Sequence, residues 1–191
     1  MDALATQNEA PNVILTDRLT MRLPEVSDFA DMVQLWSDPD VVRYIGGRTS
    51  TDDEVWQRLL RYRGLWALVG YGYWTIRETK TGDFVGEMGF ADWHRAGLPQ
   101  LRSVPEGGWV LTSAMQGKGY AREALNAALQ WLDRSITPRT SACIIAPENK
   151  RSLRLAEQCG YREVSRTAHR QTDTLVLVRD HLRRGHDCGA D

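Results

Sequence analysis

At 191 residues the chain is most simply a single domain, large enough to bury a core without a disulfide or a structural metal. Its formal net charge of −1 gives no electrostatic case for nucleic acid or an anionic membrane as the main partner. The cysteines are odd in number and lack a CxxC pair, which predicts neither a metal site nor a disulfide framework and favours a reducing, cytoplasmic setting for Cys143, Cys159 and Cys188.

The first third of the chain predicts one strand and two helices. Alternating residues within 14–23 indicate a strand. A helix over 27–37 follows, because its apolar residues fall on one face, and residues 38–40 indicate a stop or a turn. A second helix begins at Thr51, where Thr51 and Glu54 fit a capping box.

The middle third begins with a change from helical to alternating periodicity. Residues 71–78 and 84–93 predict two strands joined by a glycine-containing hairpin loop. A loop over 96–106 leads to a further strand at 108–112. A helix over 119–134 follows, with an apolar stripe suited to packing on a sheet.

The last third predicts a strand over 140–145, a short helix over 150–159, and two facing strands over 161–169 and 172–179. The full order is β-α-α-β-β-β-α-β-α-β-β. This order predicts an α/β fold in which a mixed sheet carries helices on both faces.

The two ends of the chain differ from the rest. Residues 1–12 are polar, are expected to be flexible, and lack the basic and apolar regions of a signal peptide. Residues 181–191 are expected to form a flexible tail. The intervening segment, 13–180, contains neither a repeat nor a linker, which predicts one domain, and no apolar stretch in it is long enough to span a bilayer.

Residues 116–121 carry the most informative motif, because two glycines one residue apart precede a long helix. The first N–H groups of a helix have no internal partner, and the helix dipole adds positive potential there. Gly117 and Gly119 leave these groups approachable, so the turn predicts a site for phosphate or pyrophosphate. A Walker loop is excluded because Lys118 is followed by glycine, and a dinucleotide fingerprint because Arg122 replaces its third glycine.

The same turn resembles motif A of the GNAT superfamily of N-acetyltransferases. Gln116, Gly119 and Ala121 match its pattern Q-x-x-G-x-A between a strand and a long helix. Downstream, residues 146–161 resemble motif B of that superfamily. Two motifs in the expected order are more specific than either alone.

The opening of the chain resembles one branch of this superfamily, the RimJ/RimL-like ribosomal-protein-alanine acetyltransferases. The resemblance lies in residues 15–23, in 36–39 and in Tyr44. The combined match covers roughly residues 14–178. It implies an acyl-CoA N-acyltransferase fold, with a mostly antiparallel mixed sheet that splays at the cofactor site.

The resemblance also implies acetyl-CoA as co-substrate, with no metal. In the family, the backbone of the glycine turn binds the pyrophosphate and the preceding strand pairs with the pantetheine arm. Carried onto this chain, the cofactor residues are Trp109, Val110, Leu111, Gln116, Gly117, Lys118, Gly119, Tyr120, Ala121, Arg122, Asn149 and Ser152. Asn149 is also a good helix N-cap with Ser152 at the third position, so local capping is the alternative explanation for both residues, and the motif A match favours the functional one.

Attack of a neutral amine on a thioester needs a base, donors for the oxyanion and an acid for the departing thiolate. Glu106 matches a position where family members carry a glutamate near the reacting amine, and Glu87 is the second candidate base. Ser152 is the candidate acid and ranks above Tyr161, whose position is usually in the core. The alternatives are that Glu106 is an exposed loop carboxylate and Glu87 a solvent-facing strand residue.

The function that follows is transfer of acetyl from acetyl-CoA to a primary amine, either a protein N-terminus or a small-molecule amine. The acceptor site is expected from the 38–50 loop, the two early helices and the 91–107 loop, in a monomer or homodimer. No acidic cluster stands out there, which disfavours an aminoglycoside. The alternative is a non-catalytic acyl-CoA-binding module, which would keep residues 116–121 without needing Glu106, Glu87 or Ser152.

Overall fold

A computed structural model gives the fold of most of the chain. It describes residues 13–95, 97–136, 140–169 and 172–180. The terminal segments that were expected to be flexible, 1–12 and 181–191, lie outside the described residues.

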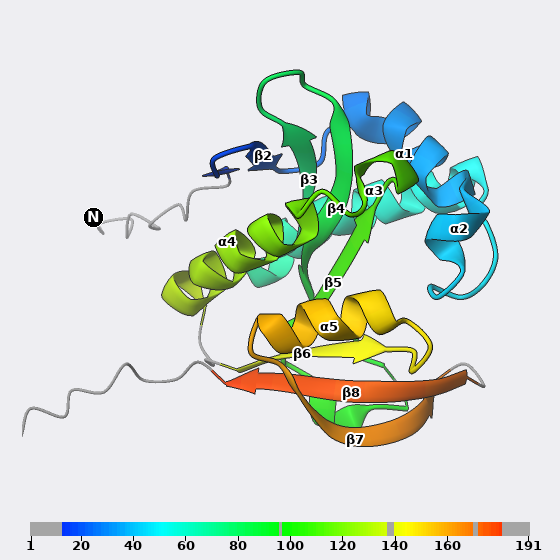
Figure 1. Cartoon of the computed structure of the whole chain (residues 1–191), viewed down its shortest axis with the longest axis vertical. Coiled ribbons are helices and arrows are strands. Elements are labelled where there is room, and N and C mark those ends of the chain that lie inside the picture. The colour runs from blue at the N-terminus through cyan, green and yellow to red at the C-terminus, as the bar shows by residue number, and fades with distance from the viewer. Residues whose placement is uncertain (1–12, 96, 137–139, 170–171, 181–191) are drawn as a thin grey trace, which may run out of the picture.

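An eight-stranded sheet forms the centre of the molecule (Figure 1). In spatial order its strands are β1 (Ile14–Leu15), β2 (Leu19–Arg22), β3 (Tyr73–Glu78), β4 (Phe84–Ala91), β5 (Glu106–Leu111), β6 (Thr140–Ile145), β8 (Thr172–Asp180) and β7 (Arg162–His169). Every neighbouring pair is antiparallel except β5 and β6, which are parallel. The predicted mixed, mostly antiparallel sheet is confirmed.

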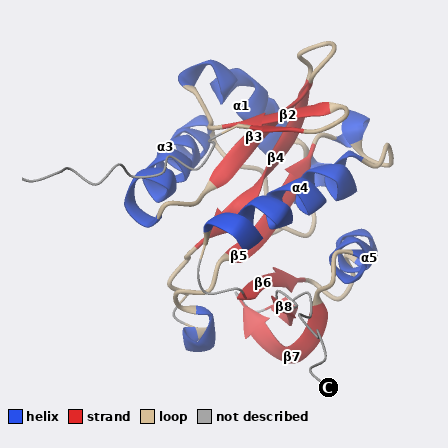
Figure 2. Cartoon of the chain, turned by 90° about the vertical axis from the view of Figure 1, so that its left-hand side faces the viewer, coloured by secondary structure: helices blue, strands red, loops and turns tan. Residues whose placement is uncertain are grey.

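Helices cover both faces of the sheet, as predicted (Figure 2). They are α1 (Phe29–Ser37), α2 (Pro39–Val42), α3 (Asp52–Val69), α4 (Tyr120–Ser135) and α5 (Lys150–Gln158). α4 and α5 pack on one face, whereas α1, α2 and α3 pack on the other. Within the described residues no helix is long and apolar enough to cross a bilayer.

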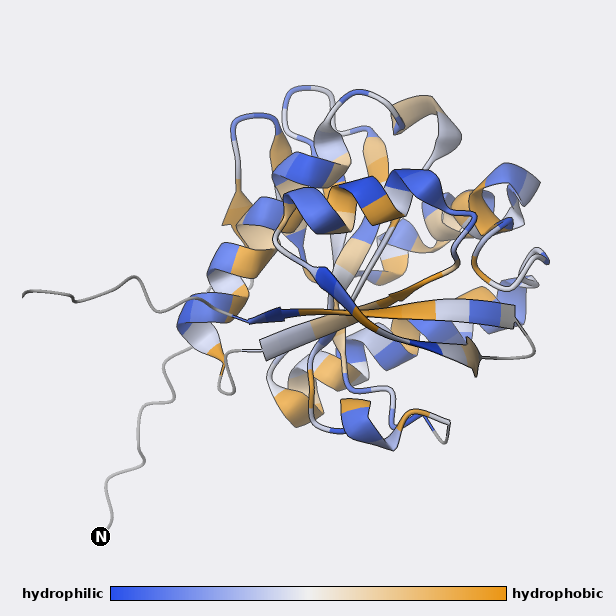
Figure 3. Ribbon diagram, turned by 60° about the horizontal axis from the view of Figure 1, so that its bottom comes forward, coloured by the Kyte–Doolittle hydropathy of each residue, from blue (hydrophilic) through white to orange (hydrophobic). Residues whose placement is uncertain are grey.

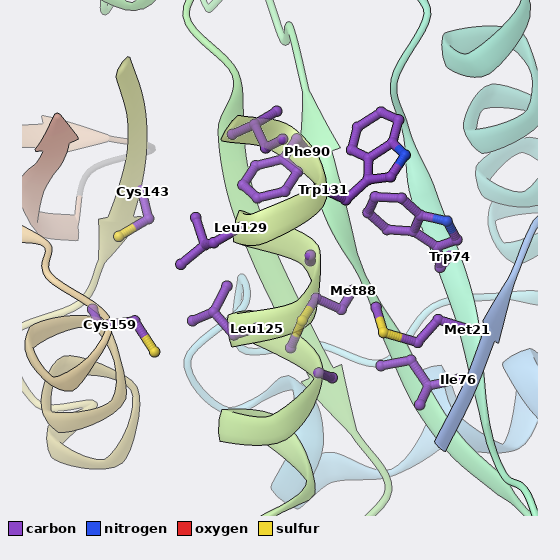
Figure 4. Close-up of a cluster of buried hydrophobic side chains, with 14 of the residues drawn as sticks. Met21, Trp74, Ile76, Met88, Phe90, Leu125, Leu129, Trp131, Cys143 and Cys159 are labelled. Atoms are coloured by element: carbon purple, nitrogen blue, oxygen red, sulfur yellow. The ribbon is translucent and has the colours of Figure 1, made fainter. Parts of the chain in front are cut away.

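Apolar residues concentrate along the strands and on the sheet-facing sides of the helices (Figure 3). On the α4 face, Leu125, Leu129 and Trp131 meet Trp74 and Phe90 of the sheet (Figure 4). The rings of Trp74 and Trp131 lie edge to face with centroids 5.1 Å apart, a favourable aromatic geometry. This packing fixes α4, and therefore its N-terminus, against the sheet.

The first predicted strand is two short strands, β1 and β2, which pair with each other. The chain turns between them because the Thr16 hydroxyl accepts a hydrogen bond from the Leu19 N–H at 2.9 Å. The Arg18 N–H also donates to Glu123 at 2.9 Å, a residue 105 positions away. Alternation alone could not reveal a turn that depends on so distant a partner.

The turn predicted at residues 38–40 is the start of a short helix. α1 ends at Ser37 as expected, but α2 begins at Pro39. The Asp38 carboxylate caps α2 by accepting a hydrogen bond from the Asp40 N–H at 2.9 Å, and proline is well tolerated at a first helical position.

The strand pair β4–β5 also differs from its predicted bounds. β4 ends at Ala91 rather than at residue 93, and β5 begins at Glu106 rather than at residue 108. Ala91 and Glu106 face each other in the register of the pair. Glu106, predicted at the end of a loop, is therefore a strand residue.

β5 and β6 separate almost as soon as they meet. Among the described residues their register contains a single pair, Glu106 with Ala142, and the Ala142 N–H donates to the Pro105 carbonyl at 3.0 Å. Beyond this point β6, β7 and β8 turn away from β5 (Figure 2). The main chain of β5 after Glu106 therefore has one edge that β6 does not pair, which matches the predicted splay.

Candidate active site

The glycine turn joins β5 to α4 beyond the point where β5 has left β6. A 3₁₀ turn, Ser113–Met115, leads into Gln116, and α4 begins at Tyr120. Gly117 and Gly119 have φ angles of 77° and 84°, a left-handed conformation that costs other residues about 1–2 kcal/mol. Backbone shape alone therefore favours glycine at both positions.

The backbone N–H groups of residues 117–122 have no hydrogen-bond acceptor within the part of the chain that the structure describes. Gly117, Lys118 and Gly119 are exposed, and a Cβ placed on Gly117 would meet nothing within 4 Å. The exposed cations Lys118 and Arg122 add positive charge to the start of the helix. Together these groups form a site for an anion.

Arg18 holds this turn in place. Its Nη1 donates to the Lys118 carbonyl at 3.0 Å, and its Nε donates to the Glu123 carboxylate at 2.7 Å. Its guanidinium also lies over the Tyr120 ring, 4.5 Å from the centroid. The turn is therefore preorganised by a residue that lies between β1 and β2.

Several predicted cofactor residues have buried side chains. Val110 belongs to the core under α1–α3, whereas Leu111 and Tyr120 belong to the core under α4. The Tyr120 hydroxyl donates to Glu78. A ligand could meet these residues through their main chain, which is the kind of contact that the resemblance implies.

Gln116 and Ser152 connect β5 and the turn to α5. The Gln116 side chain donates to the Leu111 carbonyl at 3.2 Å and accepts from Arg151 at 3.1 Å. The Ser152 hydroxyl accepts from the Trp109 indole N–H at 3.2 Å. The start of α5 thus lies against the unpaired part of β5.

Asn149 caps α5, since its side-chain oxygen accepts a hydrogen bond from the Ser152 N–H at 3.1 Å. The predicted N-cap at Asn149 is therefore confirmed, and the Ser152 hydroxyl contacts β5. Tyr161 is buried, and its hydroxyl shares a 2.9 Å hydrogen bond with Ser141. This burial fits the core position expected for Tyr161.

Glu106 is 4% exposed, so the alternative of an exposed loop carboxylate is wrong. Arg95 holds both carboxylate oxygens, with Nε to Oε2 at 2.9 Å and Nη2 to Oε1 at 2.7 Å. Glu106 is buried because the pairing of β5 with β4 begins there, and the Arg95 guanidinium balances its charge.

Glu87 is 1% exposed, so the alternative of a solvent-facing residue is also wrong. Its Oε2 accepts hydrogen bonds from the Trp36 indole at 3.0 Å and the Tyr62 hydroxyl at 3.3 Å, and its Oε1 has no partner among the described residues. Burial raises the pKa of Glu87 to about 7, although the charge of Arg58 and these two hydrogen bonds oppose the rise.

The motif order, the splayed sheet and the anion site all occur in one known family. A family model described as an acetyltransferase (GNAT) domain matches residues 18–162. The chain belongs to the GNAT acetyltransferases.

Several known proteins resemble this acetyltransferase along most of its length. A putative GNAT-family acetyltransferase from Bordetella pertussis is 34% identical, with a TM-score of 0.79 over 87% of this chain and 98% of that one. YkkB, an uncharacterized protein of Bacillus subtilis, is 30% identical over 158 residues, which are 79% of this chain and 86% of that protein. Spermidine N-acetyltransferase from Vibrio cholerae, solved with CoA and spermine, is 19% identical with a TM-score of 0.68 over 85% and 95% of the chains, and shows the fold alone.

The carboxylates and the serine of this GNAT acetyltransferase lie on opposite faces of β5. Alternate strand residues face opposite sides, so Glu106 shares the α1–α3 face with Val110. Glu87 contacts α1 and α3 and lies on that same face. Trp109 and Ser152 lie on the α4–α5 face. A proton acceptor and a proton donor can therefore act from two sides of one strand.

Sequence reasoning missed two residues that shape this GNAT site, Arg18 and Arg95. Arg18 lies within the segment that resembles the RimJ/RimL-like opening, but no local pattern connects it to the turn. Arg95 lies in the loop before β5 together with Arg102, and the sequence alone does not tell which cation pairs with Glu106. Both act through tertiary contacts.

Proposed function

We propose that this GNAT protein transfers the acetyl group of acetyl-CoA to a primary amine. The observation that carries the proposal is the turn after β5, where free N–H groups of residues 117–122 follow a strand edge that β6 leaves unpaired. Acetyl-CoA has the two features such a surface fits, a pyrophosphate for the helix start and a peptide-like arm for the strand edge. It supplies an activated acetyl thioester.

We assign the cofactor contacts to three segments. The main chain of Trp109, Val110 and Leu111 would pair with the pantetheine arm. Residues 116–122 would bind the pyrophosphate, with Lys118 and Arg122 adding charge. Asn149 and Ser152 would flank the arm from α5, a position supported by the hydrogen bond between Ser152 and Trp109.

Proton transfer is assigned to the residues on the two faces of β5. Glu106 is the proposed base that takes a proton from the acceptor amine, directly or through water, and Glu87 is the second candidate. The pKa of Glu87, near 7, suits a base, but helices enclose it. The Ser152 hydroxyl accepts from Trp109, which leaves its own hydrogen free to protonate the departing sulfur.

The acceptor is proposed as a protein N-terminus, as in the RimJ/RimL-like branch, with a small-molecule amine as the alternative. Residues 15–23 and 36–39 support the first choice. Structures below 25% identity share only the fold and do not distinguish between the two kinds of acceptor.

The proposed location is the cytoplasm. Cys143 and Cys159 are free and buried, which supports a reducing setting.

One observation favours the alternative of a non-catalytic acyl-CoA-binding module. Arg95 donates hydrogen bonds to both oxygens of Glu106, so this carboxylate already has a structural partner that accounts for its burial without a catalytic role. Such a module would bind acetyl-CoA at the turn and acetylate nothing.

The deciding experiment measures CoA thiol release from acetyl-CoA with a panel of N-terminal peptides and small amines. The proposal predicts amine-dependent release and an acceptor whose mass increases by one acetyl group. Tight binding of acetyl-CoA without acetylation of any tested amine would favour the non-catalytic acyl-CoA-binding module.

Replacement of Glu106 by Gln tests the assignment of the base. We expect kcat to fall by about 10²–10⁴, the usual contribution of a general base, with acetyl-CoA affinity unchanged. Glu148→Gln, an exposed neighbour of α5, is the matched control. The base is Glu87 if Glu106→Gln keeps the wild-type kcat and pH profile, whereas Glu87→Gln abolishes the change of kcat with pH near pH 7.

A further inference from the structure

Tyr73 lies on the same face of the sheet as the two carboxylates. It begins β3, is 6% exposed and packs among residues of α1 and α3. Its ring stacks on that of Tyr62, with centroids 4.3 Å apart and an interplanar angle of 2°. Tyr62 in turn donates to Glu87, so the orientation of the Tyr73 ring is set by a buried network.

The Tyr73 hydroxyl lies directly against the main chain of β5. A Cβ built on Gly108 would collide with the Tyr73 Oη, and the next nearest atom is the Tyr73 Cζ at 3.2 Å. Glycine at position 108 therefore lets a hydroxyl group approach the strand where every other residue would exclude it. Gly108 is the next residue after Glu106 on this face of β5.

None of the hydrogen bonds found among the described residues involves this hydroxyl, so its donor and acceptor capacity is available to a ligand. Burial raises the pKa of Tyr73, and the negative charge of Glu106 raises it further. The phenol therefore stays protonated and neutral at physiological pH. It presents two lone pairs and one hydrogen beside a carboxylate.

We propose that the Tyr73 hydroxyl binds the amino group of the acceptor and directs it toward Glu106. The inference rests on the proposed acetyl transfer and names a residue that positions the acceptor. Trp93, whose ring centroid is 6.1 Å from that of Tyr73, forms an adjacent wall of the same site. The amino group donates a hydrogen bond to the Tyr73 oxygen, which has lone pairs available to accept it.

The test compares Tyr73→Phe with Tyr71→Phe. Tyr71 is 7% exposed and belongs to the core on the α4 face, so the same atom is removed from a similarly buried ring on the face opposite Glu87 and Glu106. We expect Tyr73→Phe to lower kcat/KM for the amine by about tenfold to hundredfold, because a hydrogen bond to a charged or charging group is lost. Acetyl-CoA affinity stays at the wild-type value, and Tyr71→Phe keeps wild-type kinetics.

A second variant tests the contact with β5. Gly108→Ala is expected to raise the acceptor KM and lower the thermal unfolding midpoint, because the new methyl group collides with the Tyr73 oxygen. The double variant Tyr73→Phe/Gly108→Ala removes that oxygen and is expected to recover the midpoint while keeping the kinetics of Tyr73→Phe. Additive losses in the double variant would contradict the contact.

The outcomes separate this inference from the proposed function. If the wild-type protein acetylates an amine and Tyr73→Phe equals it in kcat/KM, Tyr73 does not position the acceptor and the acetyltransferase assignment stands. If the wild-type protein binds acetyl-CoA but acetylates no amine, both proposals are wrong. An equal loss in Tyr73→Phe and Tyr71→Phe would indicate a packing effect and overturn the role of Tyr73.

Discussion

At the scale of single residues, Glu87 combines deep burial with an ionisable group. One carboxylate oxygen receives two hydrogen bonds, and the other has no partner among the described residues. Ionisation in such a place is costly, because water is replaced by the indole of Trp36 and the phenol of Tyr62. Burial therefore shifts Glu87 toward its protonated form in the folded protein.

This preference predicts how stability depends on pH. Burial raises the pKa of Glu87 from 4.5 to about 7, so between these values the unfolded chain has lost a proton that the folded protein keeps. The unfolded state then binds fewer protons, and the free energy of unfolding falls as pH rises, by at most about 3 kcal/mol. Glu87→Gln should remove this slope in urea unfolding measured between pH 5 and pH 8.

The exposed residue Glu148 offers a matched control for that experiment. Glu148→Gln should leave the wild-type slope intact. If the free energy of unfolding changes with pH in the same way in the wild-type protein and in Glu87→Gln, burial of Glu87 does not control the pH dependence of stability.

The residue types of the candidate site were predictable, whereas their surroundings were not. Glu106 and Glu87 could be chosen from their positions near strands and from the family resemblance. Their burial depends on Arg95, Trp36 and Tyr62, which reach them through tertiary contacts. A Pro-Glu-Gly sequence indicates a loop, and only the pairing of Glu106 with β4 shows that this residue belongs to a strand.

At the scale of secondary-structure elements, the turn into α4 depends on glycines in a left-handed conformation. Gly119→Ala should lower stability by about 1–2 kcal/mol, because φ is 84° there. It should also weaken acetyl-CoA binding by about tenfold, since a Cβ would stand beside the free N–H groups and 3.4 Å from the Arg18 Nη2. Calorimetric titration with acetyl-CoA measures the second effect.

Gly82 is the control for the loss of stability that a left-handed backbone conformation alone causes. Its φ is 78° in the β3–β4 hairpin, and a Cβ there would meet nothing within 4 Å. Gly82→Ala should lose similar stability while binding acetyl-CoA as the wild-type protein does. Equal affinities for Gly119→Ala and the wild-type protein would argue against pyrophosphate at this turn.

Elements with strong periodicity were predicted well, and those shaped by single contacts were not. The apolar stripe of α4 and the capping box of α3 both appear as expected. The break between β1 and β2 and the start of α2 were missed. The first depends on Glu123, and the second on one side-chain cap from Asp38.

At the scale of the whole molecule, the sheet consists of two parts that meet at Glu106 and Ala142. β1–β5 carry the helices α1–α4, while β6, β8 and β7 diverge from them after this register pair. A continuous hydrophobic core on the α4 face joins both parts. This core supports the proposal that residues 13–180 form one domain.

The divergence has a physical consequence. The amides on the free edge of β5 lack the strand partner that would slow their exchange with solvent. The same edge is where we place the pantetheine arm, next to the pyrophosphate site at 117–122. The order of chain segments alone could not give the extent of this opening, because it is set by the register between two strands far apart in the sequence.

Amide hydrogen exchange with and without acetyl-CoA tests the central claim most directly. We predict that acetyl-CoA slows exchange in peptides covering β5 and the turn, residues 106–122, while the β3–β4 hairpin keeps its rate. Protection of another region with residues 106–122 unchanged, or no protection at saturating acetyl-CoA, would contradict the assignment of the opening as the acetyl-CoA site.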